Sequence, residues 1–296
     1  MFLYESPYPT GVSTLQIELT SPAKLNLFLL VTSQREDGYH NLQTLFQLLD
    51  YGDQMHFRLR EDEQINLLTH FEGVLAEDNL IINAANLLQN RLKALGHSVC
   101  GADISIQKKL PMGAGLGGGS SNAATTLLAL NHLWQTNIDL EELAKIGIKL
   151  GADVPIFVAG NSAYAQGVGE VLTPTEIPET WYFVLDPKVN ISTAKIFSNP
   201  QLTRNSAPIK IPALAADCIR NDCQIVVEKL YPQVAKARIW LEQFGQAQLT
   251  GTGASLFTKF ATYEDALEVF KKLPSDWDGF IAKGVNKSPT HQQMYS

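Results

Sequence analysis

A glycine-rich stretch is the part of the sequence whose residue types point most directly to a chemistry. PMGAGLGGGSS, residues 111–121, places five glycines in the seven positions from Gly113 to Gly119, although the chain has only 21 glycines in 296 residues. A strand pattern, ADISIQK, precedes it, and an Ala/Leu-rich helix pattern with serines suited to N-capping follows. This order frees backbone N–H groups to converge on an anion beside a partially positive helix end. It predicts a phosphate site, with a flexible surface turn as the alternative.

Three common phosphate-binding loops do not fit this stretch. The spacing Gly113-x-Gly115-x-x-Gly118 matches the dinucleotide fingerprint, but a second helix pattern, DLEELAKIGIKLG, follows where that fold needs a strand with an acidic residue. Gly119 stands where the ATPase loop requires lysine. The sequence also lacks the HRD and DFG signatures of protein kinases. Another type of loop must therefore hold the phosphates.

Four separate motifs resemble those of the GHMP kinases, the group named for galactokinase, homoserine kinase, mevalonate kinase and phosphomevalonate kinase. In chain order they are SPAKLNLFLLV, PMGAGLGGGSSNAA, LGADVPIFVAG and LTGTGASLF, and the likeness runs from Ser21 to Phe257. Within the group, PAKLNLFLLVTSQREDGYHNLQT is most similar to the members that act on a cytidine diphosphate methylerythritol. The resemblance implies ATP-dependent phosphorylation of the 2-hydroxyl of that alcohol, a step of the non-mevalonate route to isoprenoid precursors.

The resemblance makes Asp153 the catalytic base and Lys24 its partner. Phosphoryl transfer to an alcohol requires an oriented hydroxyl, an acceptor for its proton and neutralised charge, which a carboxylate beside an ammonium group can provide. The residues alone leave other interpretations open. Asp153 could cap a short helix that begins near Pro155, and Lys24 could lie at an exposed strand edge.

The resemblance also assigns the glycine stretch to ATP, which we expect to arrive with Mg²⁺. The predicted ATP-binding residues are Pro111, Met112, Gly113, Ala114, Gly115, Leu116, Gly117, Gly118, Gly119, Ser120 and Ser121. Ser120 or Ser121 could offer Mg²⁺ a hydroxyl, because this ion keeps several waters and takes few protein ligands. No acidic residue stands out as a metal ligand, so the metal ligands stay unassigned.

The substrate end is predicted from REDGYHNLQT and two later segments. Asp37-Gly38 is typical of a turn between two strands, after which adjacent side chains point to opposite faces. The resemblance assigns substrate binding to Asn26, Tyr39, His40, Thr193, Phe197, Gly251 and Gly253. The two aromatic residues could instead fill a core, and the histidine could be a surface residue. In the late glycine turn, Thr250 and Thr252 replace the serines usual in the family and keep a hydroxyl.

The elements that must position these residues indicate an α+β protein with two domains. Strand patterns cover residues 15–20, 24–31, 42–50 and 53–60, and a helix pattern runs from a cap at Asp78 or Asn79 to Gly96. The polar, proline-containing TPTEIPET predicts a junction, which gives domains of residues 1–172 and 173–296. The resemblance implies an N-terminal ATP-binding domain and a C-terminal ferredoxin-like domain, with the active site in the cleft between them.

Composition limits the partners and the compartment. A net charge of −7 without a run of Lys or Arg argues against nucleic acid and anionic membranes. No apolar run reaches the length of a membrane span, and the first ten residues, MFLYESPYPT, resemble neither a signal nor a transit peptide. Three scattered cysteines, Cys100, Cys218 and Cys223, favour a reducing compartment. We therefore expect a cytoplasmic enzyme, either a monomer or a homodimer.

Overall fold

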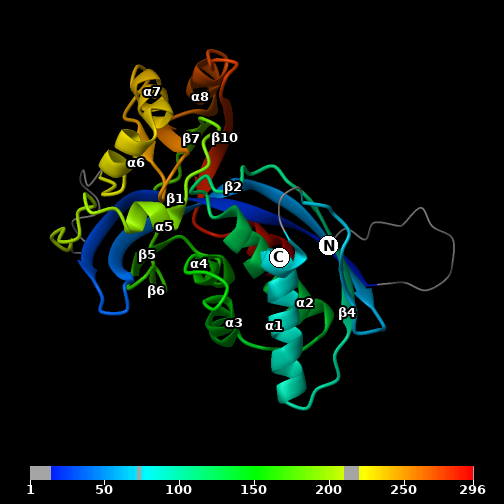
Figure 1. The fold of residues 1–296 in the computed structure, drawn as a ribbon. Coiled ribbons are helices and arrows are strands. Elements are labelled where there is room, and N and C mark those ends of the chain that lie inside the picture. Colours follow the sequence, from blue (N-terminus) through cyan, green and yellow to red (C-terminus); the bar gives the residue numbers. More distant parts are fainter. Residues whose placement is uncertain (1–14, 72–74, 210–219, 296) are drawn as a thin grey trace.

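Two long antiparallel strands form the most extensive strand pair of the molecule (Figure 1). The computed structural model describes residues 15–71, 75–209 and 220–295, and β1 (Gln16–Gln34) pairs with β2 (His40–Arg60) along most of its length. The sequence predicted two shorter strands in place of each. That prediction was wrong because register shifts at three points, the first between Pro22 and Lys24, let the pairing continue through the irregular segments.

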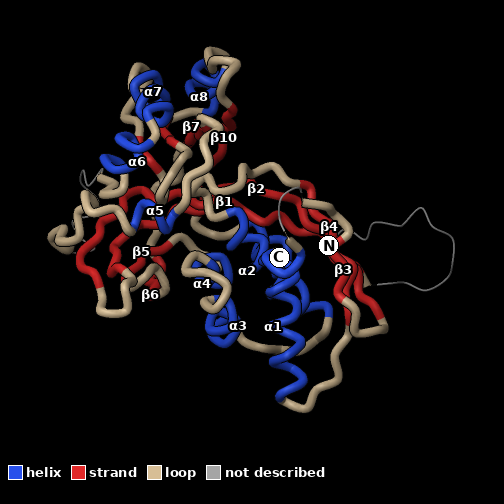
Figure 2. Tube along the Cα trace, in the orientation of Figure 1, coloured by secondary structure: helices blue, strands red, loops and turns tan. Residues whose placement is uncertain are grey.

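The first half of the chain is a sheet with helices packed on one face (Figures 1 and 2). Strand β4 lies beside β2 and carries the short parallel β3, while β5 extends another part of β2 and pairs with β6. Apolar side chains from the strands and helices form one core. The remaining elements of this half are β3 (Ile65–Leu67), η1 (Ala76–Asp78), α1 (Leu80–Ala94), β4 (Gly101–Gln107), α2 (Gly118–Leu133), α3 (Leu140–Gly147), α4 (Val154–Ala159), β5 (Ala163–Gln166) and β6 (Val171–Pro174).

The second half has its own antiparallel strands, in the order β10-β7-β9-β8, with helices against them. Strand β10 also pairs with β2, at Gly284 and Val285, so the two halves share one sheet, which has ten strands in the described residues. The predicted α+β class is thereby confirmed. These elements are β7 (Trp181–Asp186), α5 (Thr193–Phe197), α6 (Gln224–Leu230), α7 (Pro232–Leu241), β8 (Gln248–Leu249), β9 (Leu256–Phe260), α8 (Tyr263–Phe270) and β10 (Asp278–Val285).

Helix starts show where local sequence signals suffice and where they do not. Asn79 caps α1 as predicted, since its side chain accepts a hydrogen bond from the Ile81 amide. The predicted serine cap of α2 was wrong. Gly117 occupies the cap position without a side-chain bond, and Ser120 and Ser121 lie inside the first turn.

The last helix, α9 (Pro289–Tyr295), packs on the first half of the chain. Thr290 Oγ1 donates to the Thr20 carbonyl at 2.6 Å, and the Thr20 amide donates to Gln293 Oε1 at 2.7 Å. His291 lies 3.0 Å from the Val158 carbonyl through Nε2. Residues 289–295 thus pack on the N-terminal half, although the predicted limits place them in the C-terminal domain. The limits themselves, residues 1–172 and 173–296, stay a prediction.

Among the helices that the structure describes, none combines the length and apolar character needed to span a bilayer. Cys100 and Cys223 are free thiols. Cys218 and residues 1–14 lie outside the described residues.

Candidate active site

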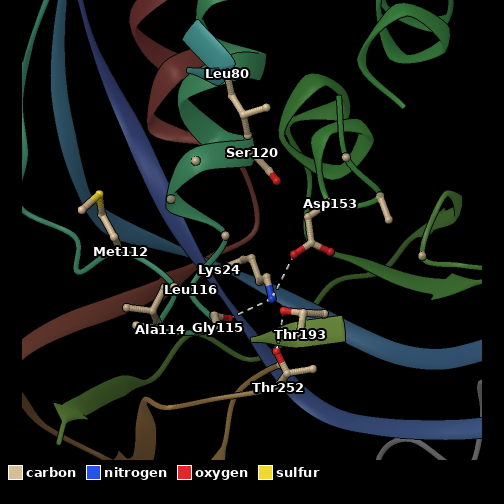
Figure 3. Close-up of a pocket in the computed structure, with 18 of the residues that line it drawn as sticks. Lys24, Leu80, Met112, Ala114, Gly115, Leu116, Ser120, Asp153, Thr193 and Thr252 are labelled. Atoms are coloured by element: carbon tan, nitrogen blue, oxygen red, sulfur yellow. Dashed lines mark hydrogen bonds and ion pairs between the residues drawn. The ribbon is translucent and has the colours of Figure 1, made fainter. Parts of the chain in front are cut away.

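A cavity of about 600 Å³ brings the predicted site residues together (Figure 3). Its walls come from β1, the glycine stretch, the start of α4, α5 and the turn after β8. The predicted residues that line it are Lys24, Asn26, residues 111–120, Asp153, Thr193, Phe197 and Gly251. The predicted residues that do not line it are Tyr39, His40, Ser121 and Gly253.

The glycine loop has no side chains at the positions where its backbone turns and touches other parts of the protein. Gly115 and Gly117 have φ angles of 78° and 73°, a region that side chains rarely adopt. A Cβ on Gly115 would lie 2.2 Å from the Thr250 carbonyl oxygen, and one on Gly117 would lie 2.9 Å from the Phe157 ring. The glycines therefore allow the loop to fit between the late turn and α4.

Hydrogen bonds from both sides fix the loop. On one side the carboxylate of Asp53, which is fully buried, accepts from the amides of Lys109 at 2.7 Å and Leu110 at 2.9 Å and pairs with Lys108. On the other side the Ser255 amide donates to the Ala114 carbonyl at 3.1 Å. The loop is thus preorganised in the protein without ligand, as an electrostatic site for phosphate requires.

Asp53, whose carboxylate holds the segment before the glycine loop, had no role in the prediction from the sequence. It stood at the start of a predicted strand, where an aspartate is usually solvent-exposed. Only the pairing of β1, β2 and β4 brings the segment before the glycine loop against it. Its position next to Gly52 in a predicted strand was a weak signal, because aspartate and glycine are depleted in strands.

Lys24 and Asp153 form an ion pair inside the cavity. Lys24 Nζ lies 3.3 Å from Asp153 Oδ2, with the two side chains 3% and 33% exposed. The same nitrogen donates to Asn26 Oδ1 at 2.5 Å and to the Gly115 carbonyl at 3.0 Å. It also lies 5.4 Å from the centre of the Phe46 ring.

The two alternative interpretations of these residues do not match the structure. Lys24 is buried, so it is not an exposed residue of a strand edge. Asp153 does occupy the N-cap position of α4, with Pro155 in the first turn, but its side chain makes no capping hydrogen bond. Its carboxylate instead points to Lys24 across the cavity (Figure 3).

The hydroxyl of Ser120 points into the same space, near Asp153 (Figure 3). The hydroxyl of Ser121 lies 2.8 Å from that of Ser21, fully buried and away from the cavity. Within the described ranges, no group of three or more His, Cys, Asp or Glu side chains is arranged to hold a metal ion. Of the two serines considered for Mg²⁺, only Ser120 is placed to meet an ion in the cavity.

Two threonines that the sequence reasoning had not assigned to the site also line the cavity. Asn26 donates through Nδ2 to Thr44 Oγ1 at 2.8 Å, which fixes the amide whose oxygen accepts from Lys24. Thr252 Oγ1 lies 2.9 Å from Thr193 Oγ1, linking the late turn to α5 (Figure 3). Thr44 had no sequence signal, because it lies in an otherwise ordinary strand pattern.

Of the three residues predicted to bind the substrate base, His40 and Phe197 are in contact and Tyr39 lies apart from them. His40 stacks on Phe197, with ring centres 5.2 Å apart and planes 29° apart. Burial, and to a lesser degree the charge of Arg204, lowers the pKa of His40 below its ordinary value. Tyr39 lies beside Gly38 in the turn before β2 and is 64% exposed. Phe197 therefore lines the cavity, His40 stacks on it without lining the cavity, and Tyr39 lies outside.

Comparisons with known proteins agree with this architecture. Residues 79–161 match the family "GHMP kinases N terminal domain" and residues 210–279 match "GHMP kinases C terminal". A crystal structure of 4-(cytidine 5'-diphospho)-2C-methyl-D-erythritol kinase aligns with 91% of this chain and 100% of its own, at 29% identity and a TM-score of 0.77.

More distant structures share the fold. A homoserine kinase from Cytophaga hutchinsonii aligns with 98% of this chain and 99% of its own, at 15% identity and a TM-score of 0.63. A mevalonate kinase from Methanococcus jannaschii aligns with 94% of this chain and 100% of its own, at 18% identity and a TM-score of 0.63. At these identities the likeness shows the fold alone.

Proposed function

The chain belongs to the GHMP kinases and is an ATP-dependent small-molecule kinase, and from that premise we propose that its acceptor is 4-diphosphocytidyl-2-C-methyl-D-erythritol. The reaction moves the γ-phosphoryl group of ATP to the 2-hydroxyl and gives the 2-phosphate and ADP. The observation that carries the transfer chemistry is the ion pair of Lys24 and Asp153 beside the glycine loop.

The glycine loop is proposed to bind the phosphates of ATP through backbone N–H groups. Positive φ angles at Gly113, Gly115 and Gly117 alternate along the loop before α2 begins at Gly118. Successive amides in such a conformation form a concave anion site, and the partial positive charge of the helix start adds to it. Because the overall charge of the chain is −7, this attraction must be local.

The ion pair is proposed to prepare the acceptor. The Asp153 carboxylate takes the proton of the 2-hydroxyl as the oxygen forms its bond to the γ-phosphorus and the bond from that phosphorus to ADP breaks. The Lys24 ammonium stabilises the negative charge that develops on the attacking oxygen. Its bonds to Asn26 and Gly115 hold it in place, so no reorganisation is needed when that charge appears.

Mg²⁺ is proposed to enter with ATP. It retains water and phosphate oxygens as most of its ligands, and the Ser120 hydroxyl in the cavity fits the role of a protein ligand. When bound, the ion neutralises charge on the phosphate oxygens.

The cytidylyl substrate is supported by two observations. The solved kinase at 29% identity carries that substrate in its name, and the alignment covers its whole chain. Phe197 in the cavity wall offers a flat face, and His40 stacked on it offers a polar ring, a combination that suits a pyrimidine base. We also propose a place in the non-mevalonate route to isoprenoid precursors and a cytoplasmic location.

The test is turnover by the purified protein with ATP and one of three alcohols. ADP release is followed with the cytidylyl substrate, homoserine and mevalonate, and ³¹P spectra identify the product. We expect turnover with the first alcohol alone and a new phosphomonoester signal beside an intact diphosphate. Turnover with homoserine or mevalonate, or none with the cytidylyl substrate, contradicts the proposal.

A further inference from the structure

Arg204 is held in one orientation by hydrogen bonds to the residues around it. Its Nε donates to His40 Nε2 at 3.0 Å, and Nη1 donates to the Leu202 carbonyl at 3.1 Å. Its Nη2 donates to the carbonyls of Phe197 at 2.8 Å and Asn199 at 2.9 Å. The guanidinium therefore ties the end of α5 to the first residue of β2.

The segment that carries Arg204 is itself fixed to the N-terminal sheet. The Ser206 amide donates to the Val31 carbonyl at 3.0 Å, and the Ile209 amide donates to Gln43 Oε1 at 2.7 Å. The segment of residues 202–209, which we call the crossing segment, thus lies across β1 and β2 near the base-binding end of the cavity. Its position allows one arginine to reach both His40 and the backbone of Phe197.

The contact between the Arg204 guanidinium and the His40 imidazole determines which nitrogen of His40 carries the proton. A guanidinium group only donates hydrogen bonds, so the Nε2 that it contacts must present a lone pair. An imidazole whose Nε2 accepts carries its one proton on Nδ1. We propose that Arg204 is a positioning residue that fixes His40 as the neutral tautomer protonated at Nδ1, which presents an N–H donor to the base of the substrate.

Three observations support this assignment. Stacking on Phe197 sets the plane of the His40 ring, and the contact from Arg204 sets its rotation within that plane. In the part of the chain that the structure describes, Nδ1 forms no hydrogen bond, so its proton is not committed to an acceptor of the protein. Burial of the ring opposes a second proton, and the adjacent cation opposes it further; both lower the pKa of His40.

The consequence for recognition rests on the proposed function. Cytosine offers acceptors at N3 and O2, and a donor at Nδ1 is complementary to either of them. The other neutral tautomer would present a lone pair at Nδ1 and repel these acceptors. Arg204 thus acts on substrate binding through His40, without itself touching the reacting atoms.

The first test reads the tautomer directly in the protein without substrate. Long-range ¹H–¹⁵N spectra of the ¹⁵N-labelled protein at pH 7 are recorded, with the His40 signals assigned by comparison with His40→Gln. We expect the cross-peak pattern of a ring that is protonated at Nδ1 and unprotonated at Nε2. A ring protonated at Nε2, or at both nitrogens, overturns the proposal. This result does not depend on which alcohol the enzyme uses, so failure of the proposed function is seen separately, in the wild-type turnover assay.

The second test removes the arginine. Arg204→Met keeps an unbranched stem but no donor, and Arg91→Met is the matched control, because Arg91 of α1 pairs with Glu142 and not with a histidine. In Arg204→Met we expect loss of the single-tautomer pattern and a KM for the cytidylyl substrate about tenfold higher, the effect of one hydrogen bond, with kcat nearly unchanged. An unchanged tautomer and KM in that variant contradict the proposal. The wild-type spectrum decides the tautomer even if the variant does not fold.

Discussion

The side-chain nitrogen of Lys24 lies 3.3 Å from a carboxylate oxygen of Asp153, although one residue is in the first strand and the other begins the fourth helix. The glycine loop is bonded to Lys24, one member of this pair, at two points. The Lys24 amide donates to the Leu116 carbonyl at 3.0 Å, and the Lys24 side chain donates to the Gly115 carbonyl at 3.0 Å. The glycine loop and Lys24 are therefore joined by hydrogen bonds, so a shift in the position of one alters the position of the other.

Asp153→Asn tests the base. We expect kcat to fall by about two orders of magnitude or more, because an amide cannot accept the proton of the alcohol. The free energy of unfolding should fall, since the buried Lys24 ammonium loses its charged partner, but the fold should persist because the Asp153 side chain forms no helix-capping bond. The measurement is steady-state turnover beside thermal unfolding.

Asp139→Asn is the control for the base variant. Asp139 does cap a helix, accepting from the Glu142 amide at 2.8 Å, and lies outside the cavity. We expect this variant to keep wild-type turnover. Near-full activity in Asp153→Asn would remove Asp153 from the mechanism.

Gly115→Ala tests the packing of the glycine loop. The new Cβ meets the Thr250 carbonyl oxygen at 2.2 Å, so the loop must move and the KM for ATP should rise at least about tenfold. Gly96→Ala is the matched control, because Gly96 has the same φ of 78° with nothing within 4 Å of the added carbon.

The alanine at position 96 should therefore show only the strain of a left-handed backbone, about 1–2 kcal/mol of unfolding free energy, and an unchanged KM. The measurements are urea unfolding and ATP titration of turnover for both variants. Equal effects of the two alanines on KM would mean that contact with the late turn does not shape the site.

Phe197→Ala and Tyr39→Ala test the aromatic contacts of the substrate base. Loss of a stacking ring at Phe197 should raise the KM for the cytidylyl substrate about tenfold or more, with kcat less affected. Tyr39 is exposed in the protein without ligand, so we expect its ring to close over the base on binding and its removal to raise KM less. The measurement is KM and kcat with saturating ATP. A wild-type KM in Tyr39→Ala would remove that residue from the site.

His291 predicts a pH dependence of stability. Burial lowers its pKa below the ordinary 6.5 in the folded protein. Between that lowered value and 6.5 the unfolded chain binds a proton that the folded protein does not, so the free energy of unfolding decreases as pH falls through this window. His291→Gln should flatten the change in urea midpoint between pH 7.5 and about pH 5.5.

His132→Gln is the matched control, because His132 is an exposed residue of α2. It should leave the pH dependence as in the wild type. A slope in His291→Gln equal to that of the wild type would contradict the assignment.

Local signals in the sequence were enough for several elements. The cap at Asn79, the turn at Asp37-Gly38 and the proline in the first turn of α4 each depend on residues within one turn of one another. The motif resemblance also predicted a kinase of this family and its two-domain fold, and both are confirmed. The roles of the individual site residues stay predictions.

What the sequence could not show depends on contacts between distant segments. Asp53 and Arg204 have partners that lie far away along the chain, and their residue types at those positions carry no local signature. The serine cap of α2 failed for a related reason. The Ser121 hydroxyl is buried against that of Ser21 in β1 and does not cap the helix, which begins earlier, after Gly117.

The bonds of α9 to Thr20 have a consequence for how the protein is made. Residues 289–295 pack on a strand that is synthesised about 270 residues earlier, at Thr20. That strand must wait, incompletely covered, while the intervening chain is translated. Met294 of α9 also packs on the N-terminal core, so chaperones that shield nascent apolar surface are expected to engage this polypeptide until α9 has been made.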